Sequence, residues 1–195
     1  MKKFLLFLFA LPLLLNFVQQ QTSLVFWNAK RPLKFEDFKA VQKDTIKIGN
    51  TGRFKGAQSS INYKYNISQS SYTVPPKIEV ITYFNPNDSW MLLKTETTLE
   101  HEQIHFNIEE LYARKMRKSI DSLVKLNICD FSIYDKILDK WEKEPIKYHN
   151  LFDKEIDDRV YYLNGKFLSD KNPRQKPWKE KVDRELKALE KFEQK

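Results

Sequence analysis

The apolar residues change their spacing partway through the chain. Apolar and polar residues alternate in two stretches, 61–67 and 78–84. A period of two is typical of half-buried β-strands and predicts an antiparallel pair or meander. From Thr97 onward the apolar residues recur at helical spacing, with no glycine or proline before Pro145. This change of period predicts an α+β fold, in which a small antiparallel sheet is followed by a helical half.

The first predicted helix runs from about Thr97 to about Leu126. Thr97-x-x-Glu100 matches the capping-box pattern, in which each side chain can satisfy the free backbone amide of the other residue. Residues 127–130 are the expected break after this helix. The sequence therefore predicts that the helix begins at a threonine cap and spans several turns.

Two further helices are expected after the break. The second begins near Ser132, and Pro145 either kinks it or splits it. Residues 161–177 contain an Asn-Gly pair and two prolines and are expected to form a loop or small hairpin. Residues 178–192 have the apolar stripe of an amphipathic helix that packs on a core. We therefore expect one domain over residues 22–195.

The first 21 residues are expected to be a signal peptide. Lys2 and Lys3 precede an apolar stretch from Phe4 to Val18. This stretch is shorter than the roughly 20 apolar residues that a membrane span needs. The residues after it lack the small side chains that signal peptidase prefers, so an uncleaved membrane anchor is the alternative. The expected location is the periplasm or the cell exterior, with transient contact with the membrane or envelope left open.

Composition limits the classes of partner and of stabilisation. The chain is 41% hydrophobic, which argues against a disordered protein. Its formal net charge of +8 is typical of a solvated basic surface. We find no basic-aromatic motif for nucleic acid, so no nucleic-acid partner is expected. Cys129 is the only cysteine, so an internal disulfide is excluded.

The main chemical signal is His101-Glu102-Gln103-Ile104-His105, an HExxH motif inside the first predicted helix. Residues four apart lie one turn apart on the same helix face, so both imidazoles can bind one zinc ion at about 2.1 Å. Glu102 would lie beside the metal, where it can take a proton from a water that the zinc acidifies. The motif predicts Zn²⁺ as cofactor, His101 and His105 as ligands, and Glu102 as the general base of amide hydrolysis.

The motif helix does not supply a third ligand. Metzincins carry a glycine and a third histidine where this chain has Ile108 and Leu111. Glu109 shares the face of the two histidines, but a straight helix places it about 12 Å from His101 along the axis. The third ligand is therefore expected later in the chain. The candidates are His149, Asp153, Glu155, Asp157 and Asp158.

Three segments of the chain are similar to one known family. They are Trp27 with residues 31–38, residues 99–115 around the HExxH motif, and residues 152–158. Over nearly everything after the export signal, the chain resembles a bacterial family of exported HExxH proteins. That family is catalogued as a domain of unknown function and described as candidate secreted zinc-dependent proteases. The resemblance implies a zincin-like fold and a protein or peptide substrate.

The sequence departs from the family pattern at several positions. A tryptophan usually stands where this chain has Phe35. The last segment corresponds to a family motif, Tyr-Asp-x-x-Thr-x-His, with Ile156 in place of the threonine and Asp158 in place of the histidine. Since an aspartate oxygen also binds zinc, the resemblance implies Asp158 as the third ligand.

Two functions follow from these features. The first is an exported zinc metallopeptidase, in which an oxyanion-stabilising side chain is also needed. The alternative is a non-catalytic envelope protein, either a degenerate zincin or a binding module with a structural zinc. A fourth protein ligand such as His149 would indicate the structural site, whereas three ligands would indicate the catalytic one. The candidates for the oxyanion-stabilising side chain are Tyr148, His149, Tyr161 and Tyr162.

Overall fold

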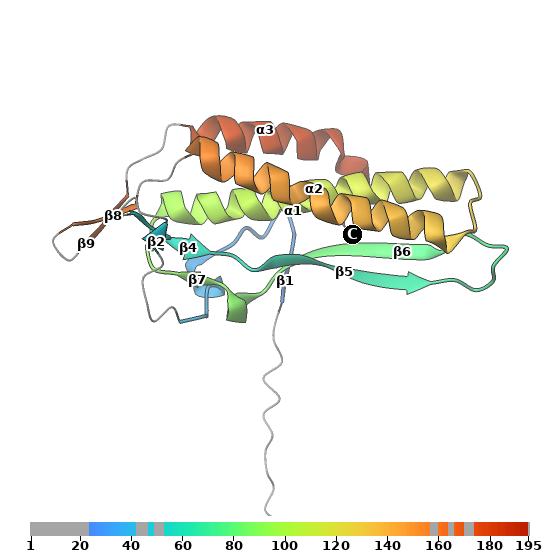
Figure 1. The fold of residues 1–195 in the computed structure, drawn as a ribbon, viewed down its shortest axis with the longest axis horizontal. Helices are drawn as coiled ribbons and strands as arrows, with labels where there is room; N and C mark the ends of the chain where they lie inside the picture. The colour runs from blue at the N-terminus through green and yellow to red at the C-terminus, as the bar shows by residue number, and fades with distance from the viewer. Residues whose placement is uncertain are drawn as a thin grey trace, which may run out of the picture.

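The described residues form an α+β fold, with three helices and small antiparallel sheets (Figure 1). The expected signal peptide, residues 1–21, lies outside the described residues. No helix among those that are described is long and apolar enough to cross a membrane. The computed structural model describes residues 24–41, 47–48, 53–156, 160–163, 166–169 and 174–194.

The two longest strands, β5 and β6, belong to a three-stranded antiparallel sheet in the order β1-β6-β5. β5 (Ile61–Ser68) pairs with β6 (Lys77–Phe84) along its whole length, with Ile61 opposite Phe84. β1 (Val25–Phe26) pairs with the other edge of β6. The antiparallel pair that the alternating residues predict is therefore confirmed.

The remaining strands are short. β8 and β9 pair antiparallel, which confirms a hairpin in the segment where a loop or hairpin is expected. β4 pairs with β7, while β2, β3, β8 and β9 form a second sheet in that order. The bounds are β2 Lys47–Ile48, β3 Arg53–Phe54, β4 Ala57–Gln58, β7 Trp90–Met91, β8 Val160–Leu163 and β9 Lys166–Ser169.

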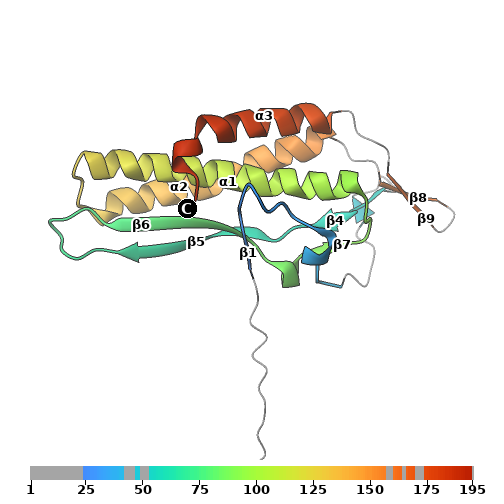
Figure 2. The same cartoon turned by 180° about the vertical axis from the view of Figure 1, so that it is seen from behind.

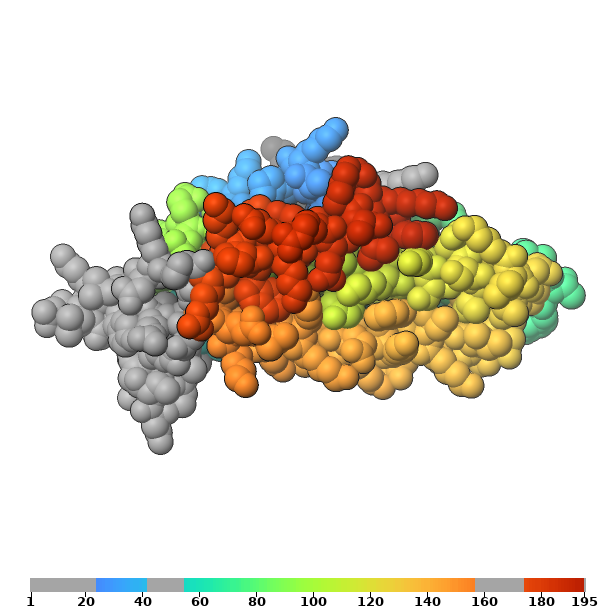
Figure 3. Space-filling model, turned by 90° about the horizontal axis from the view of Figure 1, so that it is seen from above, coloured from blue at the N-terminus to red at the C-terminus, as the bar shows by residue number. Residues whose placement is uncertain are grey.

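Three helices lie on one side of the β5–β6 sheet (Figures 1 and 2). They are α1 (Glu96–Lys125), α2 (Phe131–Ile156) and α3 (Gln175–Ala188). α1 packs on β6. α2 and α3 both pack on α1 and lie side by side (Figure 3). Asn127, with a φ of 53°, reverses the chain after α1, and asparagine tolerates this left-handed conformation. α1 and α2 therefore run antiparallel.

The start of α1 corrects the expected cap. Thr95 caps the helix, because its hydroxyl accepts a hydrogen bond from the backbone N–H of Thr98 at 3.2 Å. The predicted capping box of Thr97 and Glu100 is wrong, since Thr95 starts the helix earlier and both residues lie inside it. Glu100 instead accepts a hydrogen bond from the side-chain amide of Gln175 at 2.8 Å, which ties α1 to α3.

The other helices match their predicted positions closely. α2 begins one residue before Ser132 and continues through Pro145, so the alternative of two separate helices is wrong. α3 and a 3-10 turn over Glu190–Phe192 confirm the amphipathic C-terminal helix. Pro177 lies in the first turn of α3, where a missing backbone N–H leaves no intrahelical hydrogen bond unmade.

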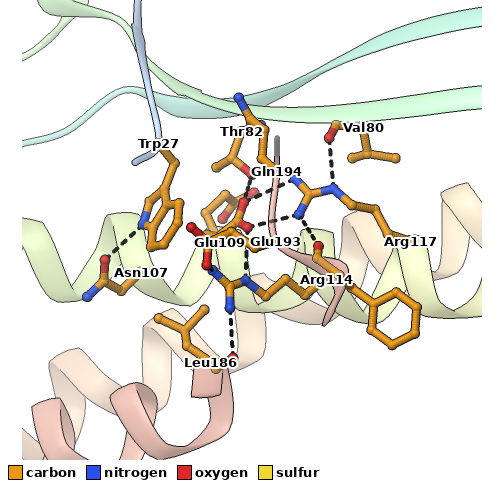
Figure 4. Close-up of polar contacts among 12 residues, drawn as sticks. Trp27, Val80, Thr82, Asn107, Glu109, Arg114, Arg117, Leu186, Glu193 and Gln194 are labelled. Carbon is orange, nitrogen blue, oxygen red and sulfur yellow. Dashed lines mark hydrogen bonds and ion pairs between the residues drawn. The ribbon is translucent and has the colours of Figure 1, made fainter. Parts of the chain in front are cut away.

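A buried carboxylate ties α1 to its neighbours. Glu110 is fully buried and accepts hydrogen bonds from the Thr82 hydroxyl at 2.8 Å, from Arg114 at 3.0 Å and from Arg117 at 2.8 Å. Arg117 also donates to a carbonyl of β6, and Arg114 to a carbonyl of α3 (Figure 4). A buried charge is tolerated when it is paired in this way, and the network holds α1 in one rotation about its axis.

The N-terminal segment docks on α1 through a residue of the HExxH motif. The backbone N–H of Leu33 donates to the side-chain oxygen of Gln103 at 2.7 Å, and the Gln103 amide donates to Asn107 at 2.8 Å. The Trp27 indole donates to the same Asn107 oxygen at 2.9 Å (Figure 4). These bonds hold α1 at the turn that carries the two histidines. Gln103 and Asn107 make them on a different side of α1 from the one that faces α2.

Candidate metal centre

Two imidazoles and one carboxylate converge between α1 and α2. His101 and His105 lie one turn apart on α1, and their Nε2 atoms are 3.0 Å apart. Asp153, in the last turns of α2, places Oδ1 2.9 Å from Nε2 of His105 and 3.2 Å from Nε2 of His101. The spacing of the HExxH motif therefore brings both histidines to one point, and α2 adds a carboxylate there.

This donor set fits a tetrahedral metal ion. Ligand atoms that each lie about 2.1 Å from a tetrahedral ion lie roughly 3.4 Å from one another. The three distances between the Nε2 and Oδ1 atoms are close to this value. His101, His105 and Asp153 form the metal-ligating group of the described residues, and no fourth histidine, cysteine or acidic side chain in that part of the chain belongs to it.

The group is closed on the protein side and open toward solvent. Phe152 is fully buried, stacks on the His101 ring at 4.7 Å and meets the His105 ring edge-on at 5.0 Å. The two histidine side chains are 13% and 14% exposed, whereas that of Asp153 is 54% exposed. A bound ion would therefore have rigid aromatic packing behind it and access from the side of Asp153.

The protonation states favour metal binding. Burial lowers the pKa of His105, although the hydrogen bond to Asp153 and the charge of Glu102 partly oppose this effect. Burial alone would raise the pKa of Asp153, but its hydrogen bonds with His101 and His105 outweigh burial and hold that pKa well below its usual range. A neutral imidazole and an ionised carboxylate are the forms that bind a metal.

Glu102 lies beside this group and outside it. Its carboxylate is almost completely buried, and Oε2 accepts a hydrogen bond from the hydroxyl of Ser59. Ser59 lies between β4 and β5, so the sheet and α1 hold the carboxylate together. The charge of Glu102 raises the pKa of His105, so the carboxylate acts electrostatically on that ring although it is not part of the ligand group. This is the arrangement expected of a base that is not a ligand.

His149 contacts the other edge of the His105 ring. The Nδ1 atoms of His105 and His149 are 2.8 Å apart, on the side of the ring opposite Nε2. Nε2 of His149 lies 2.8 Å from Oε2 of Glu109. His149 therefore does not join the ligand group, and neither does Glu109, as its distance along the helix predicts.

The candidates for the third ligand lie in different places. Asp153 lies with the two histidines, whereas Glu155 accepts a hydrogen bond from the Trp178 indole at 2.8 Å. Asp157 and Asp158 lie outside the described residues, so the family-based assignment of Asp158 stays a prediction.

The oxyanion candidates are also only partly described. The Tyr148 hydroxyl donates to Glu185 at 2.7 Å, and burial, followed by this bond, raises the pKa of Tyr148. The side chains of Tyr161 and Tyr162 are not among those described.

Sequence reasoning did not anticipate Ser59, and it did not select Asp153. A signal for Asp153 is present in the sequence, because His149, Phe152 and Asp153 share one face of a helix at i, i+3 and i+4. A helix that folds back antiparallel on the HExxH helix brings such a face onto the two histidines. No comparable local signal points to Ser59.

Comparison with protein-family models, with curated proteins and with solved structures finds no match to this chain. The resemblance to the exported HExxH family therefore stays a prediction, and the proposed function rests on the geometry of the site.

Proposed function

We propose that this chain is an exported zinc-dependent metallopeptidase that hydrolyses peptide bonds in the periplasm or outside the cell. The observation that carries the proposal is the convergence of His101, His105 and Asp153, with Glu102 buried beside them. Two histidines and one carboxylate form a ligand set found in catalytic zinc sites, which keep one position open for water or substrate. A zincin-like role for α1 is part of the same proposal.

The residues divide into ligands and a base. His101, His105 and Asp153 would hold a divalent metal, which would supply Lewis-acid polarisation of the scissile carbonyl and lower the pKa of water. Glu102 takes a proton from the attacking water as the water oxygen bonds to the carbonyl carbon. It then gives this proton to the amine nitrogen as the carbon–nitrogen bond breaks. The Ser59 hydroxyl holds one oxygen of Glu102, so the base keeps one orientation throughout.

The rival function is a non-catalytic envelope protein with a structural zinc. Such a site needs four protein ligands, and His149 was the expected fourth. The contact between the Nδ1 atoms of His149 and His105 places His149 away from Nε2 of His105, which supports a three-ligand site. The departures from the family motif at Ile156 and Asp158 are what favour the rival.

The test combines metal content with hydrolysis. The purified wild-type protein is expected to contain about one zinc per chain and to cleave denatured protein substrates. A chelator should abolish cleavage, and added zinc should restore it. His101→Ala and His105→Ala should each remove the metal and the activity. Zinc without hydrolysis would favour the structural function, and a wild-type protein that binds no metal would overturn the proposal.

A further inference from the structure

Polar side chains of α1 and α2 alternate along the line where the two helices meet. His101, His105 and Glu109 recur every four residues on α1, and His149 and Asp153 are four apart on α2. Because the helices are antiparallel, Asp153 contacts His105, His105 contacts His149, and His149 contacts Glu109. The result is one continuous chain of hydrogen-bonding groups that begins at the candidate metal centre and ends at a carboxylate.

The chemistry of imidazole sets the direction of each bond in this chain. A histidine that binds a metal through Nε2 carries its proton on Nδ1. In His105 this Nδ1–H would donate to Nδ1 of His149, 2.8 Å away. His149 must then carry its own proton on Nε2, which donates to Oε2 of Glu109 at 2.8 Å. Each contact is therefore satisfied when His105 is a ligand through Nε2.

The far end of the chain is held in place. The Glu109 side chain is only 12% exposed, and that of His149 is 21% exposed. The Tyr63 hydroxyl of β5 donates to the backbone carbonyl of Glu109 at 3.1 Å, so the sheet contacts α1 at this turn. Neither His149 nor Glu109 belongs to the metal-ligating group of the described residues.

We infer that Glu109 and His149 are positioning residues that hold His105 as an Nε2 ligand. This inference rests on the proposed metal site. The His149 nitrogen fixes the rotation of the His105 ring and keeps the His105 proton on Nδ1. Glu109 fixes the His149 ring and keeps the His149 proton on Nε2. A hydrogen bond that ends on a carboxylate also makes the ligating nitrogen more basic, which strengthens the bond to the metal.

The test measures metal affinity and a spectroscopic signature. His149→Phe keeps a ring of similar size and removes both hydrogen bonds, and Glu109→Gln keeps the size of the side chain and removes its charge. Zinc affinity, measured by competition with a chromophoric chelator, should fall about 10- to 100-fold in His149→Phe and by less in Glu109→Gln. The visible absorption of the Co²⁺-loaded protein should change in both variants.

Two further variants make the experiment specific. Glu96→Gln removes a charge from an exposed position in the first turn of α1, and it should bind zinc as the wild type does. His149→Asn keeps an oxygen that can accept from His105 Nδ1–H. It should recover part of the affinity that His149→Phe loses, and it provides the comparison if His149→Phe does not fold.

The outcomes separate this inference from the proposed function. Wild-type affinity and an unchanged Co²⁺ spectrum in Glu109→Gln and in the His149 variants would overturn the inference and leave the metal site intact. A loss of metal in the His149 variants as complete as that in His105→Ala would make His149 a ligand and also overturn it. A wild-type protein that binds no metal would overturn the proposed function itself.

Discussion

The hydroxyl of Ser59 donates a hydrogen bond to Oε2 of Glu102, across 43 positions of sequence. Ser59 belongs to the segment between β4 and β5, and Glu102 to the HExxH turn of α1. A carboxylate that acts as a base must present the same oxygen to water in every cycle, and a bond to its other oxygen restricts its rotation. The sheet therefore contributes directly to the position of the proposed base.

Ser59→Ala is expected to lower kcat/KM by roughly tenfold, because Glu102 loses the bond that restricts its rotation. Zinc content should stay at the wild-type level, since Glu102 is not a ligand. Steady-state hydrolysis of a protein substrate and metal analysis check both statements. Ser60→Ala removes the neighbouring hydroxyl and is the matched control. Equal activity in the two variants would show that the Ser59 bond has no role in the reaction.

Glu102→Gln is expected to keep the metal and to lower the rate of hydrolysis by about 100-fold or more. The amide has nearly the same shape as the carboxylate and can still bond to Ser59, but it cannot accept a proton from water. Metal analysis and single-substrate kinetics on the same preparation measure the two effects. If the variant also loses its zinc, Glu102 has a structural role in the site; if it turns over at the wild-type rate, the proposed base is wrong.

Asp153→Asn is expected to weaken zinc binding about 100-fold or more, because an amide oxygen is neutral and a poorer zinc ligand than a carboxylate. Asp158→Asn is the matched comparison, since the family resemblance implies Asp158 as the third ligand. Competition with a chelator gives both affinities. Loss of zinc in Asp158→Asn with normal binding in Asp153→Asn would establish the family-based assignment in place of the one the geometry favours.

Asp37 provides a pH-dependent contribution to stability that is independent of the candidate metal centre. Its carboxylate accepts two hydrogen bonds from Arg31, at 2.8 and 2.6 Å, and one from the backbone N–H of Lys34 at 2.8 Å. Burial raises the pKa of Asp37, but the bonds from Arg31 and Lys34 outweigh burial and lower it overall. Asp37→Asn should lower the free energy of unfolding at pH 7 by about 1–2 kcal/mol, a value limited by the solvent exposure of Arg31.

The sign of the pH effect follows from the direction of that shift. Since the folded-state pKa of Asp37 lies below the unfolded value of about 3.9, the unfolded state binds more protons as the pH falls. The stabilisation is therefore present above about pH 4 and is lost as the pH falls toward the folded-state pKa. Denaturant unfolding at several pH values should give a wild-type advantage over Asp37→Asn that shrinks below pH ~4.

A surface pair on α1 is the control for this measurement. Asp121 and Lys125 form an exposed ion pair, so Asp121→Asn should change the free energy of unfolding by less than about 1 kcal/mol. A difference between the wild type and Asp37→Asn that stays constant from neutral to acidic pH would contradict the assignment of the stabilisation to the Asp37 carboxylate.

The strand pair, the long helices and the first two proposed ligands follow from local sequence. β5 and β6 alternate apolar and polar residues because a strand exposes successive side chains to opposite faces. His101 and His105 meet because four residues make about one helical turn, and no other part of the molecule is needed for this. The start of α1 was less predictable, because Thr95 and Thr97 both suit a cap and only the earlier one is used.

The third position of the site was decided by tertiary structure. Each step of one residue along α2 turns the side chain by about 100°, so the rotation of α2 against α1 decides which of the candidates on α2 reaches the two histidines. In the described part of the chain, that rotation brings Asp153 to the two histidines and His149 to the back of His105. The contact of Ser59 with Glu102 likewise depends on how the sheet packs on α1. Local spacing thus determined the proposed ligands within one helix, and packing between distant segments decided the described partners that come from elsewhere in the chain.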